Sequence, residues 1–150
     1  MLKATGASKG SLYHHFANKR QLYEAVLERV EERLAQATVD AASGIRDPLE
    51  ALRAGCRTFL RPAREPEIRQ IVLRDAPTVI GWEQWRALDE RYAFGLLKHS
   101  VMAIGPKGSL DPDALAHLLL AALAMLQAHP DATSVDAQAA LDAVLDRLLG

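Results

Sequence analysis

The pattern of apolar positions along the chain is helical throughout. In segments separated by proline and glycine, apolar residues recur every three or four positions, and no segment alternates apolar and polar residues as a strand does. The sequence therefore predicts an all-α fold, without internal repeats. We expect helices over residues 9–16, 19–42, 48–61, 66–74, 82–104, 112–129 and 135–149.

Capping residues mark where these helices begin and end. Ser8 and Asn18 are good N-caps, because their side chains accept hydrogen bonds from the first free amides of a helix. Asp47 and Asp111 each precede a proline, a residue that suits the first helical position. Pro77 is expected to end the helix that starts near residue 66, since proline disfavours helical geometry in the residue before it.

Composition and charge narrow the class of protein. A chain of 150 residues fits one domain, its single cysteine excludes an internal disulfide, and no secretion signal is visible. The longest apolar run, 114–128, is shorter than the roughly 20 residues that span a bilayer. We therefore expect a cytoplasmic protein without a membrane segment. The net charge is −1, yet residues 1–20 carry +4, so one end of the chain could contact phosphate.

The segment 5–22 predicts a turn, a short helix, a second turn and the start of a long helix. Leu12 and Phe16 give the short helix one apolar side, which Leu22 and Val26 of the long helix can cover. The opposite side carries small or polar groups around a helix N-terminus, where the helix dipole favours phosphate. A recognition helix for the major groove of DNA is built in this way.

The sequence of this segment, Thr-Gly-Ala-Ser-Lys-Gly-Ser-Leu-Tyr-His-His-Phe-Ala-Asn-Lys-Arg-Gln-Leu, resembles the helix-turn-helix of TetR-type transcriptional regulators. Thr5 and Ala7 depart mildly from the alanine and valine that the family favours. The resemblance implies that Lys9, Gly10 and Ser11 approach base edges. It also implies that a second group of side chains reaches phosphates, namely Ser8, Tyr13, His14, His15 and Lys19. For Tyr13 and His15, packing between the helices remains the alternative.

The resemblance also suggests how the chain is divided. Residues 1–34 would be a partial DNA-binding domain with the start of a connecting helix, and residues 35–150 a ligand-binding and dimerisation domain. The family pattern places a first helix and most of a second before Gly6, whereas this chain begins at Met1. We therefore expect weak or no binding to double-stranded DNA. The alternative function is a helical dimer that does not bind DNA and acts as a ligand-binding or protein-interaction module.

The last two helices are expected to form a homodimer. The helix over 114–128 is apolar nearly all round and needs cover on every side, and the helix over 135–149 has a broad apolar stripe. Two such helices from each subunit would make a four-helix bundle, while a monomer with its core here is the alternative. Such a dimer would read a near-palindromic operator. The candidate interface residues are Leu115, Leu118, Leu119, Ala122, Leu126, Leu141, Val144, Leu145 and Leu148.

The resemblance further implies a cavity among the middle helices for an unknown small-molecule effector, whose binding shifts the population of DNA-binding states. Bulky or soft side chains on these helices are the candidate lining, with core packing as the alternative: Cys56, Phe59, Trp82, Trp85, Tyr92, Met102 and His117. For His117 we favour a hydrogen-bonded interior or interface role. A row of arginines around Arg53 and Arg57 is either a solvated surface or a site for an anionic effector.

No catalytic chemistry is expected. The sequence lacks the spacing of a metal pair, a glycine-rich phosphate loop or a nucleophile elbow. Cys56 has no sequence partner and is predicted to be a small buried group. We therefore predict neither a metal nor a cofactor. The resemblance makes the chain a DNA-binding transcriptional regulator, and repression is the commonest mode of the family.

Overall fold

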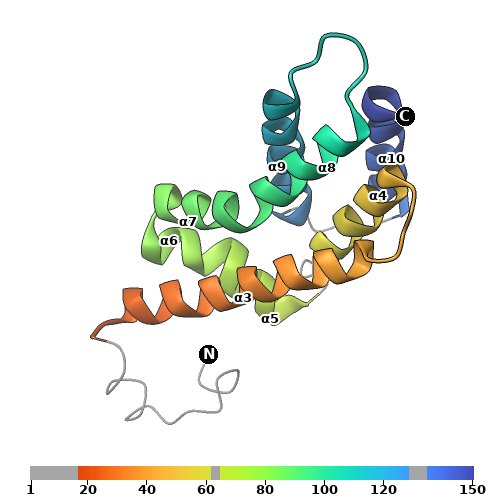
Figure 1. Ribbon diagram of the computed structural model, residues 1–150. Coiled ribbons are helices and arrows are strands. Elements are labelled where there is room, and N and C mark those ends of the chain that lie inside the picture. Colours follow the sequence, from red (N-terminus) through yellow and green to blue (C-terminus); the bar gives the residue numbers. More distant parts are fainter. Residues whose placement is uncertain (1–16, 62–64, 129–134) are drawn as a thin grey trace.

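The computed structural model describes residues 17–61, 65–128 and 135–150, and all of its regular elements in these ranges are helices, joined by loops (Figure 1). The all-α prediction is confirmed, while the predicted helix over 9–16 lies outside the described residues. None of the described helices has the length and apolarity to cross a membrane. The elements, with η for a π-helical segment, are α3 (Lys19–Ala42), α4 (Pro48–Phe59), α5 (Pro66–Arg69), η2 (Gln70–Asp75), α6 (Ala76–Ile80), α7 (Trp82–Asp89), η3 (Glu90–Phe94), α8 (Gly95–Ile104), α9 (Pro112–Ala128) and α10 (Val135–Leu149).

Three of the predicted caps are present and explain where their helices begin. The Asn18 side chain accepts a hydrogen bond from the amide of Gln21 at 3.0 Å, at the start of α3. Asp47 accepts from the amide of Leu49 at 3.4 Å. Asp111 accepts from an amide in the first turn of α9 at 2.9 Å. Each cap satisfies an amide that has no partner within its helix. The predicted bounds of α3, α4, α9 and α10 are confirmed to within two residues.

A proline lies inside the continuous helical segment formed by α5, η2 and α6, so the prediction that Pro77 ends a helix is wrong. In η2 the amide of Ala76 donates to the carbonyl of Ile71, five residues earlier. The next donor in this register would be Pro77, which has no N–H, and Val72 is left without that main-chain partner. The helical segment ends instead at Gly81, whose φ of 88° favours glycine.

Trp85 supplies the donor that the Val72 carbonyl lacks. Its indole Nε1 lies 3.0 Å from the Val72 oxygen. The Trp85 ring is buried and stacks on Trp82, with 4.9 Å between the ring centroids. This contact joins α7 to η2. The single helix predicted over 82–104 is confirmed as the continuous segment α7, η3 and α8.

Two hydrophobic clusters form the core, and α3 contributes to both. Figure 1 shows α6 and α7 over the first half of α3, with α4 along its second half. We name the first group of buried residues the Trp85 cluster; it consists of Tyr23, Leu27, Val72, Ala76, Ile80, Trp85 and Leu88. The second, the bundle cluster, consists of Leu34, Leu52, Cys56, Phe59, Leu60, Ala93, Leu97, Val101, Leu115, Ala116, Leu119, Leu120, Leu123, Leu141, Leu145 and Leu149.

Polar contacts fix α4 against the C-terminal helices. Arg53 forms ion pairs with Asp146 and, at 3.6 Å, with Asp142 of α10, while Arg57 lies 3.9 Å from Asp142. Gln127 of α9 donates to a main-chain carbonyl at the end of α4, at 2.6 Å. Arg53 and Arg57 therefore hold two helices together, which argues against an anionic effector at this row of arginines.

We expect Trp85→Phe to lower the free energy of unfolding by about 2–3 kcal/mol, because the Val72 carbonyl loses its donor and the smaller ring leaves space in the core. Urea unfolding followed by circular dichroism measures the change. Trp82→Phe is the matched control, since Trp82 is 61% exposed and should change stability by less than about 1 kcal/mol. Equal losses in the two variants would show that the indole hydrogen bond contributes nothing.

Candidate functional site

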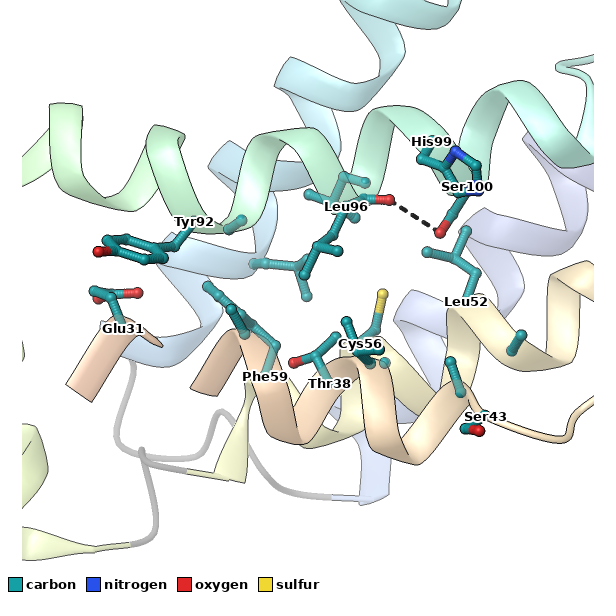
Figure 2. Close-up of a pocket in the computed structure, with 18 residues that line it drawn as sticks. Glu31, Thr38, Ser43, Leu52, Cys56, Phe59, Tyr92, Leu96, His99 and Ser100 are labelled. Atoms are coloured by element: carbon teal, nitrogen blue, oxygen red, sulfur yellow. Dashed lines mark hydrogen bonds between the residues drawn. The ribbon is translucent and has the colours of Figure 1, made fainter. Parts of the chain in front are cut away.

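A cavity of about 410 Å³ lies between the second half of α3, α4 and the continuous segment η3–α8 (Figure 2). Small-molecule sites in proteins have volumes of roughly 300–1,000 Å³ and mostly apolar walls. The walls here are apolar apart from a few polar groups. The lining residues are Glu31, Ala35, Thr38, Val39, Ala42, Ser43, Ala51, Leu52, Gly55, Cys56, Phe59, Tyr92, Ala93, Leu96, Leu97, His99, Ser100 and Leu123.

Small residues on facing helices explain the hollow. Ala35 and Ala42 on α3 and Ala51 on α4 leave space where larger side chains would fill the core. At Gly55 the two helices approach closely, because a Cβ atom there would lie 3.1 Å from the side chain of Thr38. The α3–α4 contact therefore closes the wall of the cavity, and the small side chains beside it keep the interior open.

Three of the predicted lining residues, Cys56, Phe59 and Tyr92, lie on the cavity wall. Burial raises the pKa of the Cys56 thiol to about 12, so this side chain stays neutral and acts as a small apolar surface. The Tyr92 hydroxyl donates to Glu28 at 3.0 Å, and this hydrogen bond raises the pKa of the phenol and fixes its ring. Their role in binding a ligand stays a prediction.

The other four candidates, Trp82, Trp85, Met102 and His117, are not part of this cavity. Trp85 packs towards η2, and the Trp82 and Met102 side chains are exposed. His117 does not lie in the interior either, because it is exposed, with Nδ1 3.0 Å from the carbonyl oxygen of Asp113, and its role at an interface stays a prediction. The choice by residue type failed because the position around each helix decides which side chains face inward.

Glu31 is the functional candidate that the sequence analysis missed. Its side chain is buried, with 6% exposed, although it is acidic. It lies on the buried stripe of α3, four residues after Leu27 and three before Leu34, and that spacing was the available signal. Burial, and to a lesser degree the charge of Asp89, raise the pKa of Glu31 from 4.5 to about 8. Among the described residues, no hydrogen bond or ion pair offsets this cost.

A second buried acid, Asp89 at the end of α7, adds to the negative character of this region. Burial and the neighbouring charge of Glu90 raise its pKa from 3.8 to about 6. The cation of η3, Arg91, lies 3.0 Å from Glu28 and is therefore already paired. Asp89 does not line the cavity, but its charge acts on Glu31, which does, and no ion pair joins a cation to either carboxyl group within the described residues.

Of the predicted DNA-contacting residues, Lys19 is within the described part of the chain. It is exposed in the first turn of α3, with Nζ 5.6 Å from the centroid of the Tyr23 ring. The remaining predicted contacts lie outside the described residues: Ser8, Lys9, Gly10, Ser11, Tyr13, His14 and His15. The predicted domain boundary at residue 34 falls inside α3, which therefore connects the DNA-binding motif directly to the cavity.

The predicted interface residues divide into two groups. Those that face the bundle cluster of their own subunit are buried or partly buried: Leu115, Leu119, Leu126, Leu141, Leu145 and Leu148. The exposed group is Leu118, Ala122 and Val144, and Met125 joins it with 70% exposed. The described residues of one chain therefore do not cover every side of the helix over 114–128, as was expected for this helix. We call Leu118, Ala122, Met125 and Val144 the exposed strip.

These features define an all-α protein with a ligand-sized apolar cavity, in which one helix runs from the cavity back towards the segment whose sequence resembles a helix-turn-helix. No group of side chains suited to hold a metal occurs in the described ranges.

The comparisons agree with this class. Residues 49–150 match the family model "Tetracyclin repressor-like, C-terminal domain", and residues 2–26 match "Bacterial regulatory proteins, tetR family". The chain belongs to the TetR family of transcriptional regulators, whose members are not enzymes. Its structure is similar to the crystal structure of a TetR-family transcriptional regulator from Pectobacterium atrosepticum, with a TM-score of 0.75, 29% identity, and coverage of 99% of this chain and 80% of that one. No curated protein matches the chain.

We expect stability to fall with rising pH because of Glu31. Its raised pKa means that the folded protein holds a proton which the unfolded chain has released between its pKa of 4.5 and about 8. The contribution is therefore fully present below the unfolded value and is lost as pH rises through the folded value. Between pH 6.5 and 8.5 the free energy of unfolding should fall by about 1–2 kcal/mol.

Glu31→Gln should remove this slope, and Glu32→Gln, at the exposed neighbouring position, should keep it. Urea unfolding at the two pH values measures both variants. The same pH dependence in all three proteins would contradict the assignment of the raised pKa to Glu31.

Proposed function

We propose that this TetR-family regulator is a repressor whose affinity for operator DNA is controlled by a small molecule bound in the cavity. The observation that carries the proposal is the course of α3. This helix has 24 residues, which corresponds to about 36 Å. Its first turn follows the helix-turn-helix motif, and its second half lines the cavity from Glu31 to Ala42. A ligand that displaces the second half of α3 therefore also moves its first turn. This turn follows the proposed recognition helix for DNA, which we call the reading head.

Ligand control of this kind requires different affinities for two arrangements of the helices. A molecule that binds more tightly when α3 lies farther from α8 shifts the population towards that arrangement. The proposed DNA contacts, Lys9, Gly10 and Ser11 at base edges and the phosphate contacts around them, would then move relative to the groove. Repression is proposed because it is the commonest mode of regulation in the family. Action on DNA implies a cytoplasmic location.

The exposed strip supports a homodimer. Leu118 and Met125 are 68% and 70% exposed on α9, and Val144 of α10 is 47% exposed. Large apolar side chains left exposed on a surface are candidates for a contact with a partner. We propose that α9 and α10 of two subunits pack across this strip as a four-helix bundle, which would place two reading heads on successive turns of a near-palindromic operator.

We expect the chain to bind weakly to duplexes taken from the DNA upstream of its own coding sequence. Lys9→Ala should weaken that binding further, by about 5- to 100-fold, because one base contact contributes about 1–3 kcal/mol. Fluorescence anisotropy measures the affinity. Arg46→Ala, in the exposed loop beyond the far end of α3, is the control. If no duplex binds, or if Lys9→Ala has no effect, the function is that of a helical dimer without DNA binding.

We expect the double variant Leu118→Glu and Met125→Glu to be monomeric, since four buried carboxylates would face each other in the proposed bundle. Sedimentation velocity reports the mass in solution. Met102→Glu is the matched control, because Met102 is 61% exposed but lies on α8. A dimer that withstands the double substitution would place the interface elsewhere.

A further inference from the structure

Glu31 occupies a position that the core alone does not explain. Leu27 and Leu34 on the same stripe of α3 belong to the two hydrophobic clusters, so an apolar side chain at position 31 would complete the packing. A buried ionisable group without a partner is costly, and such groups cluster at functional sites. Glu31 lines an apolar cavity large enough for a small molecule. These observations point to a partner that is supplied by the ligand.

We propose that the cavity binds an organic cation, an amine or quaternary ammonium with an apolar body, whose charged centre lies against the carboxylate of Glu31. The proposal rests on the ligand-binding function proposed above and names the chemistry of the ligand. The mostly apolar lining excludes a small hydrated metal ion as the natural occupant, because the ligand must cover hydrocarbon walls as well as meet a charge.

The aromatic side chains near Glu31 suit a cation. Figure 2 shows Tyr92 and Glu31 at one end of the cavity, with Phe59 further along the wall. The faces of such rings attract a cation, and more strongly where water is excluded. The hydrogen bond of 3.0 Å to Glu28 holds the Tyr92 ring in this position. Further along, Leu52 and Leu96 provide the surface for an apolar body.

The charges around this end favour a cation over an anion. Asp89 is buried and acts on Glu31, and Glu28 is already paired with Arg91 at 3.0 Å. Arg69 lines a small hollow on another side of Glu31 but forms no ion pair with it in the described structure. The other titratable and charged groups around Glu31 are Asp89, whose charge acts on it, Arg69 in the small hollow, and Tyr92 and His99 on the cavity wall. An anion here would meet the carboxyl group of Glu31 and the nearby charge of Asp89, whereas a cation would compensate this negative charge.

The proposal implies that ligand binding releases a proton. The pKa of about 8 keeps Glu31 protonated at neutral pH, and a cation beside it favours the ionised carboxylate. The affinity for a permanent cation should therefore rise with pH up to about this pKa. At pH 7 we expect the release of about one proton per bound cation, which calorimetry in buffers of different ionisation enthalpy measures.

The test compares three probes of similar shape by isothermal titration calorimetry: octyltrimethylammonium, octanol and octanoate. We expect the wild-type protein to bind the cation at least about tenfold more tightly than octanol, and octanoate most weakly. Glu31→Gln, which keeps the size of the side chain, should bind the cation and octanol equally, with no proton release. Asp89→Asn should lower the pKa of Glu31, reduce the proton release on cation binding at pH 7, and leave the affinity for octanol unchanged. Retained octanol binding shows that the cavity of each variant is intact.

The proposal is overturned if the cation has no advantage over octanol in the wild type, if the advantage survives in Glu31→Gln, or if none of the three probes binds. The proposed function is tested separately, by measuring duplex binding with each probe present. If the cation binds through Glu31 but duplex binding does not change, the proposed ligand control of DNA binding is contradicted and the proposed ligand class stands. If octanol binds and weakens duplex binding, and the cavity shows no preference for the cation, ligand control stands and the proposed ligand class is contradicted.

Discussion

The packing of one side of α3 is the constraint on which the rest of the structure depends. Tyr23 and Leu27 on this side enter the Trp85 cluster, and Leu34 enters the bundle cluster. Glu31 lies between them and faces the cavity. Because both halves of the helix are held by apolar contacts, α3 is fixed along its length to the helices that follow it. The position of its first turn therefore depends on how its second half packs.

The two π-helical segments place side chains that regular helices would direct elsewhere. In η2 the wider register accommodates Pro77 and leaves a carbonyl for Trp85. The wider register of η3 begins directly after Asp89 and includes Ala93. It keeps the side chains at a spacing of four buried, namely Asp89, Ala93, Leu97 and Val101. A spacing of four drifts around a helix of 3.6 residues per turn, and a wider turn compensates for the drift. Such segments are frequent at functional sites, and η3 carries Tyr92 into the cavity wall.

Local signals in the sequence predicted the helices well, and long-range contacts account for what they missed. Asn18 and Asp47 act through neighbouring amides, so their effect is visible in the sequence. Pro77 also has a strong local preference, but a π register and a tryptophan from another helix override it. Within the site, Cys56 and Phe59 were identified by type, whereas Glu31 was missed because charged residues are usually placed outside. Its place in an apolar stripe was nevertheless readable from spacing alone.

The cavity contacts two helices through which the protein is proposed to act: α3, which leads to the reading head, and α9, which carries most of the exposed strip. The extent of each contact indicates which helix a ligand displaces more. On α9, Leu123 faces the cavity while Leu118 and Met125 face outward on the exposed strip. A ligand could therefore change the arrangement of two subunits as well as the position of α3. However, α3 lines the cavity over about three turns, from Glu31 to Ala42, whereas α9 contributes Leu123 to the described lining. The larger contact belongs to α3, so the displacement of the reading head within each subunit should exceed any change between subunits.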